Sequence, residues 1–296
     1  MTKPQIICFG EVLWDILPSG KMPGGAPMNV AIHLSYNNFS PLVISRVGSD
    51  DLGKELLSFL REKNLSTEWI QVGETHLTGV VKANISDKNE VTYKIVEPVA
   101  WDYIQFDAQV ADLVAASDVF IYGSLAARNP TTRQTLLRYL KLARFKVLDV
   151  NLRPPYYNQE RIQELLQYAD VAKMNHQELE EISGWFGWAG DGKEQMEAVR
   201  QHFNLQLLIV TRGEKGAAVV SEAGYHEHEG HRVEVEDTIG SGDAFLATFL
   251  KFYLHQEPVQ KALARACLIG AYVATQKGAT PRIDLSKFEN TPLTHI

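Results

Sequence analysis

Short apolar segments alternate with segments of helical pattern along the first two thirds of the chain. The apolar segments are rich in β-branched and aromatic residues and occupy residues 6–10, 41–48, 118–124, 145–152, 170–175 and 205–213. Stretches between them, such as 130–143 and 158–169, repeat their apolar residues with the period of a helix. Nearly continuous apolar strands that alternate with amphipathic helices are typical of a parallel sheet covered on both faces. The pattern therefore predicts an α/β protein.

Two regions depart from this rhythm. Residues 77–86 (LTGVVKANIS) and 90–98 (EVTYKIVEP) alternate apolar and polar positions around the turn SDKN (86–89), which predicts a hairpin with one wetted face. The segment EVLWDILPSGKMPGG also has a strand-like pattern. We expect residues of about 11–25 and 76–100 to form a small β sheet that acts as a lid. Since no repeat or long linker interrupts the chain, we expect residues 1–296 to form a single domain.

Beyond residue 240 the pattern is mostly helical, and the junction EDTIGSGDAF (236–245) raises a chemical question. Helix starts bind anions because their first amides lack partners and the helix dipole adds positive charge. Gly240, Ser241 and Gly242 would let a phosphate approach these amides closely. Asp243 would then face a hydroxyl and take its proton, as an acid does in phosphoryl transfer. An ordinary helix start with Asp243 in its first turn gives the same local pattern, so both interpretations stay open here.

Composition and charge narrow the class of protein. The chain has 296 residues, 45% of them hydrophobic, and a net charge of −7 without a basic block, which disfavours nucleic-acid binding. It has no apolar run of about 18 residues and begins directly with strand-like sequence, so we expect a cytoplasmic protein with no membrane partner. Cys8 and Cys267 both lie in apolar runs and are predicted to be core residues.

Two motifs resemble those of one enzyme family. DTIGSGDAF (237–245) resembles the D-T-x-G-[AS]-G-D-x-F signature of the ribokinase/fructokinase (PfkB) family of sugar kinases. GGAPMNVA (24–31), followed by Gly48, resembles the family's sugar-side glycine motif, and the two occur in the family's order. The resemblance implies a ribokinase-like three-layer α/β/α core with a mostly parallel sheet and a small β-sheet lid. It also implies an ATP-dependent sugar kinase with Asp243 as the base.

The resemblance assigns a sugar-binding role to Asp15, Gly24, Gly25, Asn29 and Arg153. Carboxylate and amide side chains suit sugar hydroxyls, and DVNLRPPYY (149–157) resembles the D-x-N-x-R stretch of fructokinases and 2-keto-3-deoxygluconate kinases. Arg153 would offer a rigid donor fork at the carboxyl end of a strand, where ligands bind in open α/β sheets. A solvated strand residue at Asp15 and a surface ion pair at Arg153 are the alternatives.

The nucleotide side rests on two further stretches. Asn175 and Glu178 in KMNHQELEE match the family's N-x-x-E motif, which organises Mg²⁺ and the nucleotide phosphates largely through water. LLIVTRGEKGA (207–217) resembles the nucleotide loop V-T-x-G-x-x-G, with Thr211, Gly213 and Gly216 in place. A strand that ends in a glycine-rich turn before a hairpin would look similar.

Relatives often bind a monovalent cation such as K⁺ beside the anion site. The resemblance places Asp237, Ile239 and Gly278 in plausible positions for it. Cys267 stands where many relatives have an asparagine near the nucleotide, which makes this chain's adenine contacts a departure from the family pattern.

The substrate expected from the resemblance is D-fructose, phosphorylated at O6. VEPVAWDYI (96–104), GGAP and DVNLR together resemble fructokinases most. A 2-keto-3-deoxygluconate kinase is the alternative, although the Tyr-Arg pair often found after its lid appears here as Tyr93-Lys94. Nucleoside kinases of the same fold fit DVNLR less well. A non-catalytic sugar-binding regulator is the alternative from another class, and the intact GSGD argues against it. We expect a homodimer that pairs through the lid sheet.

Two other stretches imitate known sites. GWAGDGKE (187–194) resembles a P-loop, but Glu194 replaces the hydroxyl that binds magnesium. HEHEGH (226–231) looks like a metal motif, yet His226 and His228 of a strand would share one face without a complete ligand set. We expect a solvated hairpin edge there.

Overall fold

The structure is a computed structural model that describes residues 3–17, 20–85, 91–284 and 288. Its strands are β1 (Ile6–Phe9), β2 (Leu13–Leu17), β3 (Gly20–Gly24), β4 (Leu42–Gly48), β5 (Ile70–Gly73), β6 (Gly79–Ile85), β7 (Val91–Ile95), β8 (Val119–Gly123), β9 (Lys146–Asp149), β10 (Val171–Asn175), β11 (Leu207–Thr211), β12 (Ala217–Ser221) and β13 (Gly224–His228). Its α-helices are α1 (Ala26–Tyr36), α2 (Asp51–Glu62), α3 (Ala108–Ala116), α4 (Pro130–Leu140), α5 (Gln159–Tyr168), α6 (His176–Trp185), α7 (Gly192–His202), α8 (Ser241–Leu254) and α9 (Val259–Ala274).

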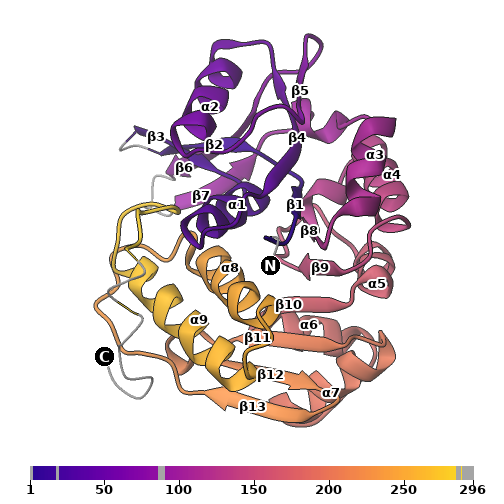
Figure 1. Cartoon of the computed structure of the whole chain (residues 1–296), viewed down its shortest axis with the longest axis vertical. Helices are drawn as coiled ribbons and strands as arrows, with labels where there is room; N and C mark the ends of the chain where they lie inside the picture. The colour runs from indigo at the N-terminus through magenta and orange to yellow at the C-terminus, as the bar shows by residue number, and fades with distance from the viewer. Residues whose placement is uncertain (1–2, 18–19, 86–90, 285–287, 289–296) are drawn as a thin grey trace.

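The main sheet has nine strands in the order β13-β12-β11-β10-β9-β8-β1-β4-β5. All neighbours from β11 to β5 are parallel, and only the hairpin β12–β13 joins antiparallel at one edge. Figure 1 shows this order running from β5 at the top to β13 at the bottom. The strand order reverses at β1, so the carboxyl ends of β1 and its neighbours border the crevice where α/β sheets bind ligands.

Alternate residues of each strand enter two separate cores. Ile6 and Cys8 of β1 pack in a cluster with residues of α1, α2, α8 and α9, whereas Ile7 and Phe9 pack in a cluster with residues of α3 to α7. The two sets of helices accordingly lie on opposite faces of the sheet (Figure 1). Since both faces are buried, near-continuous apolar strands are what this architecture requires. The predicted ribokinase-like three-layer α/β/α core is confirmed.

A second sheet of four strands, in the order β3-β2-β6-β7, lies apart from the main one. It contains the strands predicted from both irregular regions, while the predicted turn at 86–89 lies outside the described residues. Strand β2 pairs in parallel with β6 and antiparallel with β3. The sheet is fixed to the core by Trp14 of β2, whose Nε1 donates to the Leu52 carbonyl of α2 at 2.9 Å. The buried Trp101 packs beneath it with Leu13 and Val81.

The starts of the helices fall into two groups. A side chain at the residue before α2, α3, α4, α5, α6 and α7 accepts from the first free amides, and that residue is always Asp or Asn. Within the described residues α1, α8 and α9 have no such cap; α1 and α8 begin after Gly25 and Gly240, both with positive φ, and α9 begins after Pro258. Asp191 and Glu194 cap α7 reciprocally, so the P-loop-like stretch is a helix start. Among the described helices, none has the length and apolar character needed to cross a membrane.

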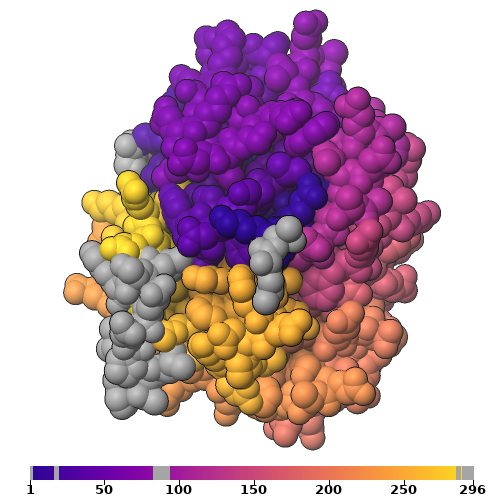
Figure 2. Space-filling view, viewed as in Figure 1, coloured from indigo at the N-terminus to yellow at the C-terminus, as the bar shows by residue number. Residues whose placement is uncertain are grey.

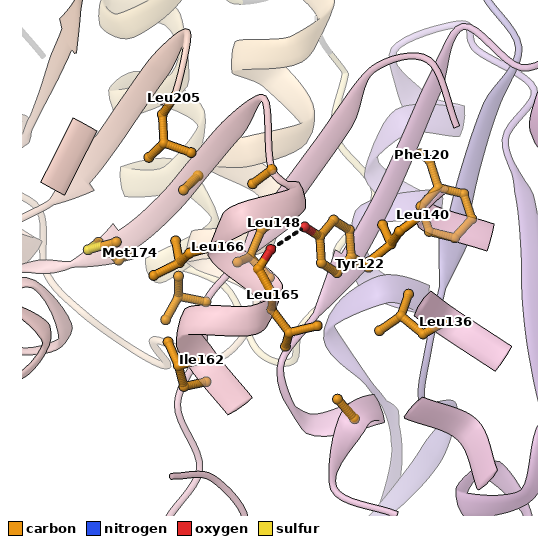
Figure 3. Packing of buried hydrophobic residues seen from close by; sticks show 14 of the residues in the cluster. Phe120, Tyr122, Leu136, Leu140, Leu148, Ile162, Leu165, Leu166, Met174 and Leu205 are labelled. Atoms are coloured by element: carbon orange, nitrogen blue, oxygen red, sulfur yellow. Dashed lines mark hydrogen bonds between the residues drawn. The ribbon is translucent and has the colours of Figure 1, made fainter. Parts of the chain in front are cut away.

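The hydroxyl of Tyr122 in β8 secures α5 to the sheet. It is fully buried and donates to the Leu165 carbonyl at 2.8 Å (Figure 3). That carbonyl belongs to the last turn of α5, where carbonyls lack a partner within the helix. The bond therefore replaces the water that the helix end would otherwise need.

We expect Tyr122→Phe to lower the free energy of unfolding by about 1 kcal/mol, because it removes the donor and leaves a buried carbonyl unpaired. Urea unfolding of both proteins measures the difference. The kinetic constants should not change, since the bond lies in the core below the sheet. A loss smaller than about 0.3 kcal/mol would contradict the assigned role.

Candidate active site

The catalytic candidate Asp243 lies in the first turn of α8. Its carboxyl group is buried, with 8% of the residue exposed, and Oδ2 accepts a hydrogen bond from Nδ2 of Asn29 at 2.8 Å. Asn29 belongs to α1, which packs against α8 in the structure. Figure 2 shows the same proximity, since the C-terminal segment lies directly against the N-terminal one. The two family-like motifs therefore meet at a single hydrogen bond.

The backbone around Gly240 to Gly242 is bare, as the sequence predicts. Gly240 has a φ of +78°, and a Cβ there would lie 2.2 Å from the carbonyl oxygen of Ala279. A Cβ on Gly242 would lie 2.9 Å from Nζ of Lys173. The hydroxyl of Ser241 donates to the Gly270 carbonyl of α9 at 2.9 Å and so ties α8 to its neighbour. Only glycine fits at residue 240, and the amides at the start of α8 carry no side-chain cap within the described residues.

Lys173 is a site residue that the sequence analysis missed. It lies in β10, where Asp149 of β9 is its direct neighbour in the sheet, and its Nζ donates to both carboxylate oxygens at 3.1 Å. Burial alone would lower the pKa of Lys173, but Asp149, Asp243 and Glu178 outweigh it and hold that pKa above its usual value. A lysine inside the apolar run VAKMN was the available signal, because a buried cation needs an anionic partner.

The electrostatic environment suits Asp243 to act as a base. Burial raises its pKa to about 6, and the charge of Asp149 adds to this, whereas Lys173, Asn29 and Arg153 act in the opposite direction. The carboxylate is therefore ionised above about pH 6 and holds protons more strongly than an ordinary aspartate. A raised pKa makes a carboxylate a better proton acceptor near neutral pH.

The small sheet brings Asp15 to the same region. A Cβ on Gly24 would lie 2.3 Å from Oδ2 of Asp15, so the bare glycine of β3 makes room for this carboxylate. Burial raises the pKa of Asp15 to about 6, with Arg153 lowering it and Asp237 raising it further. Met22 of β3 faces Gly278, whose Cβ would lie 3.5 Å from the methionine methyl group. The small sheet thus lies over residues from both halves of the chain.

Glu11 is a second residue that the sequence analysis missed. It follows β1 and is 2% exposed, and within the described residues its Oε2 has no hydrogen-bond partner. Gly25, after which α1 begins, lies against the backbone of this residue, since a Cβ there would lie 2.4 Å from the carbonyl oxygen of Glu11. Burial raises the pKa of Glu11 to about 7; the charge of Arg153 lowers this pKa, and the charge of Asp243 raises it further. An acid directly after the first buried strand was the signal that could have identified Glu11 from the sequence.

Asn175 and Glu178 form a reciprocal cap at the start of α6. Oδ1 of Asn175 accepts from the Glu178 amide at 2.9 Å, and Oε2 of Glu178 accepts from the Asn175 amide at 2.8 Å. Oε1 of Glu178 also accepts from the Leu152 amide at 2.8 Å. Glu178 therefore connects the segment after β9 to the end of β10, and burial raises its pKa. Each carboxylate oxygen keeps a second lone pair, which leaves room for a bound water.

The predicted nucleotide loop follows β11. Thr211 ends that strand, and Gly213 and Gly216 have φ values of +60° and +75°. A Cβ on Gly216 would lie 2.0 Å from the carbonyl of His228, so this glycine allows the loop to lie against the end of β13. Gly213 has open space around its Cβ position. Cys267 of α9 is buried beside Ala217, and burial raises its pKa to about 12.

Asp237, Ile239 and Gly278 come together as the sequence predicts. Oδ1 of Asp237 accepts from the Ile239 amide at 2.9 Å, and Oδ2 accepts from the Gly278 amide at 3.2 Å. No group of three or more His, Cys, Asp or Glu side chains within the described ranges could hold a metal ion by itself. These residues therefore fit a cation only together with backbone carbonyls or bound water.

Comparison with known proteins agrees with this geometry. Residues 18–285 match the model of the pfkB family carbohydrate kinases. The chain belongs to this family. A relative named probable fructokinase-7, from Arabidopsis thaliana, is 28% identical to this PfkB chain over 308 residues, which cover 93% of the chain and 88% of the relative.

Two solved structures share the fold of this PfkB kinase. A fructokinase from Xylella fastidiosa with bound ATP superposes with a TM-score of 0.81 at 24% identity, covering 94% of each chain. A fructokinase double mutant from Vibrio cholerae O395, bound to fructose, ADP and a potassium ion, gives a TM-score of 0.81 at 22% identity. That match covers 95% of this chain and 96% of the other. Both comparisons show the ribokinase-like fold.

The residues predicted for the PfkB site divide into two groups. On the sugar side, Asn29 bonds directly to Asp243, and the charge of the exposed Arg153 acts on both Asp15 and Asp243. Those predicted for the nucleotide lie at the carboxyl ends of β10 and β11, further along the same edge of the sheet. Gly48 lies instead against the Thr78 amide, 2.8 Å from its Cβ position, at the base of the small sheet.

We expect Gly240→Ala to damage both stability and turnover in this PfkB kinase. The positive φ alone costs an L-residue about 1–2 kcal/mol, and the new methyl group would meet the backbone of Ala279. Gly184→Ala in α6 is the matched control, because its Cβ position is open and alanine favours a helix interior. Urea unfolding and turnover of both variants measure the effect. A Gly240→Ala protein with normal stability and activity would contradict the steric argument.

Proposed function

We propose that this chain transfers the γ-phosphoryl group of ATP to the 6-hydroxyl of D-fructose. The observation that carries the proposal is the buried carboxyl of Asp243, held by Asn29 at a helix start that lacks a side-chain cap. The similarity to fructokinases supports fructose as the sugar, and the ATP and ADP bound in the two solved structures support the phosphoryl donor.

In the proposed reaction Asp243 removes the proton from the sugar hydroxyl as its oxygen attacks the phosphoryl group. The amides of Gly240 to Gly242 would donate to the charge that spreads over the transferring oxygens, and Lys173 adds a positive charge nearby. Asn29 orients the base by holding Oδ2. General-base catalysis of this kind typically contributes about 10²–10⁴ in rate.

The sugar would be bound between the small sheet and the core. Asp15, Gly24 and Gly25 come from the small sheet and its exit, and Arg153 comes from the segment after β9. We propose that the small sheet acts as a lid that excludes water and limits hydrolysis of ATP. The homodimer that pairs through this sheet remains a prediction from the sequence.

Mg²⁺, when bound with ATP, would neutralise charge on the nucleotide phosphates. Asn175 and Glu178 fit such an ion through bound water, because their oxygens are already engaged by backbone amides. Thr211, Gly213 and Gly216 would contact the nucleotide. The carboxylate of Asp237, fixed by two amides, would help to hold a monovalent cation such as K⁺ beside Ile239 and Gly278.

We expect D-fructose to give the highest kcat/KM in a screen with 2-keto-3-deoxygluconate, ribose and adenosine. A coupled assay of ADP release at fixed Mg·ATP measures the four constants, and ³¹P NMR of the product identifies the phosphorylated position. A preference for 2-keto-3-deoxygluconate would favour the alternative kinase. Sugar binding without ADP release would favour the non-catalytic regulator.

We expect Asp243→Asn to lower kcat by about 10²–10⁴ while the protein stays folded. The folded pKa of about 6 lies above the ordinary value of 3.8, so ionising this group at neutral pH disfavours folding, and an amide removes that cost. The thermal midpoint at pH 7.5 should therefore not fall. Asp51→Asn, an exposed acid in the first turn of α2, is the matched control. A variant that keeps half of the normal rate would refute the base assignment.

A further inference from the structure

One face of α1 connects Asp243 to the backbone that lies behind the Gly240–Gly242 amides. Asn29, His33 and Tyr36 are spaced at i, i+4 and i+7, so they share one side of the helix. Asn29 donates to Asp243, Nε2 of His33 lies 2.9 Å from the carbonyl oxygen of Ala279, and the Tyr36 hydroxyl donates to the Thr280 carbonyl at 3.4 Å. Figure 1 shows α1 beside α8, the helix that begins directly after Gly240.

The carbonyl of Ala279 also limits the space beside Gly240. The Cβ position of Gly240 lies 2.2 Å from that oxygen and 2.6 Å from the Cα of Ala279. Any shift of Ala279 would therefore change the space in which Gly240 adopts its positive φ. The amides after Gly240 start α8, so their direction depends on the position of the Ala279 backbone.

His33 can act only as a donor to this carbonyl. It is 1% exposed, and burial lowers its pKa to about 4, with the charge of Lys63 acting in the same direction. The ring is therefore neutral and carries a single N–H, which must be on Nε2 because a carbonyl oxygen only accepts. Nδ1 is buried, and the described residues give it no partner. The histidine is thus committed to one hydrogen bond.

We propose that His33 is a positioning residue for phosphoryl transfer, which holds the Ala279 carbonyl so that the Gly240–Gly242 amides keep their direction. The inference rests on the proposed function. The positioning role differs from simple packing of α1, because loss of the His33 N–H should affect the transfer step and not only stability.

The test compares four variants with the wild-type enzyme. His33→Leu fills the space without a donor, and His33→Asn carries a donor on a side chain that is too short. His33→Gln places an amide nitrogen near the position of the histidine Nε2. Leu34→Ala is the control, because it creates a cavity on the same helix at a fully buried residue that does not bond to Ala279.

We expect His33→Leu and His33→Asn to lower kcat by about 10- to 100-fold with little change in the KM for fructose. Loss of a direct donor costs about 10²–10³ in kcat, and His33 acts through a neighbour. His33→Gln should restore kcat to within about threefold of wild type, and Leu34→Ala should lose stability but keep its kcat. If His33→Leu fails to fold, the comparison of Asn with Gln decides the question.

Two outcomes would overturn the proposal in different ways. An active wild-type enzyme whose kcat is unchanged in His33→Asn, or equally low in His33→Asn and His33→Gln, would overturn the positioning role alone. A wild-type protein that releases no ADP with any sugar would overturn the proposed function and this inference with it.

Discussion

The site depends on keeping one carboxylate ionised inside a buried helix start. Asp243 gives up hydration, and the structure compensates with the dipole of α8, the amide of Asn29 and the charge of Lys173. Lys173 in turn needs Asp149, its neighbour in the sheet, because a lone buried ammonium group would cost several kcal/mol. The adjacency of β9 to β10 and of α1 to α8 therefore supplies the partners that this one side chain requires.

The choice of helix caps shows where the fold gives up stability for function. A side-chain cap stabilises a helix by about 1 kcal/mol, and six helices of the described chain have one from Asp or Asn. At α8, Gly240 provides no side-chain cap, and the Ser241 amide donates to the Thr238 carbonyl at 3.3 Å instead. At α1, Gly25 likewise provides no side-chain cap, and a Cβ there would lie 2.4 Å from the carbonyl oxygen of Glu11. Of the three helix starts without a side-chain cap in the described part of the chain, those of α1 and α8 border the candidate site.

Local patterns were sufficient to predict most of the strands, the helices at 130–143, 158–169 and beyond residue 240, and the two glycine motifs, because each depends on neighbours in the sequence. The pairings across the chain were not predictable in this way. Asn29 was assigned to the sugar, yet it bonds to Asp243, which lies 214 residues away. Glu178 was expected to act on magnesium, and the structure adds a backbone role through Leu152. Lys173, a charge in an apolar run, has a partner that only the strand order reveals.

Arg153 links the acids of the site, since its charge lowers the pKa of Glu11, Asp15 and Asp243 while its own side chain is exposed. Removing water from around it would strengthen each of these attractions and also disfavour charged groups. Asp243 is already buried, so covering the site would add little to its desolvation. Asp149, whose charge raises the pKa of Asp243, is buried as well, so the main change on covering the site would be at the exposed Arg153. In the proposed reaction, closure of the small sheet over a neutral sugar would thus not oppose ionisation of Asp243.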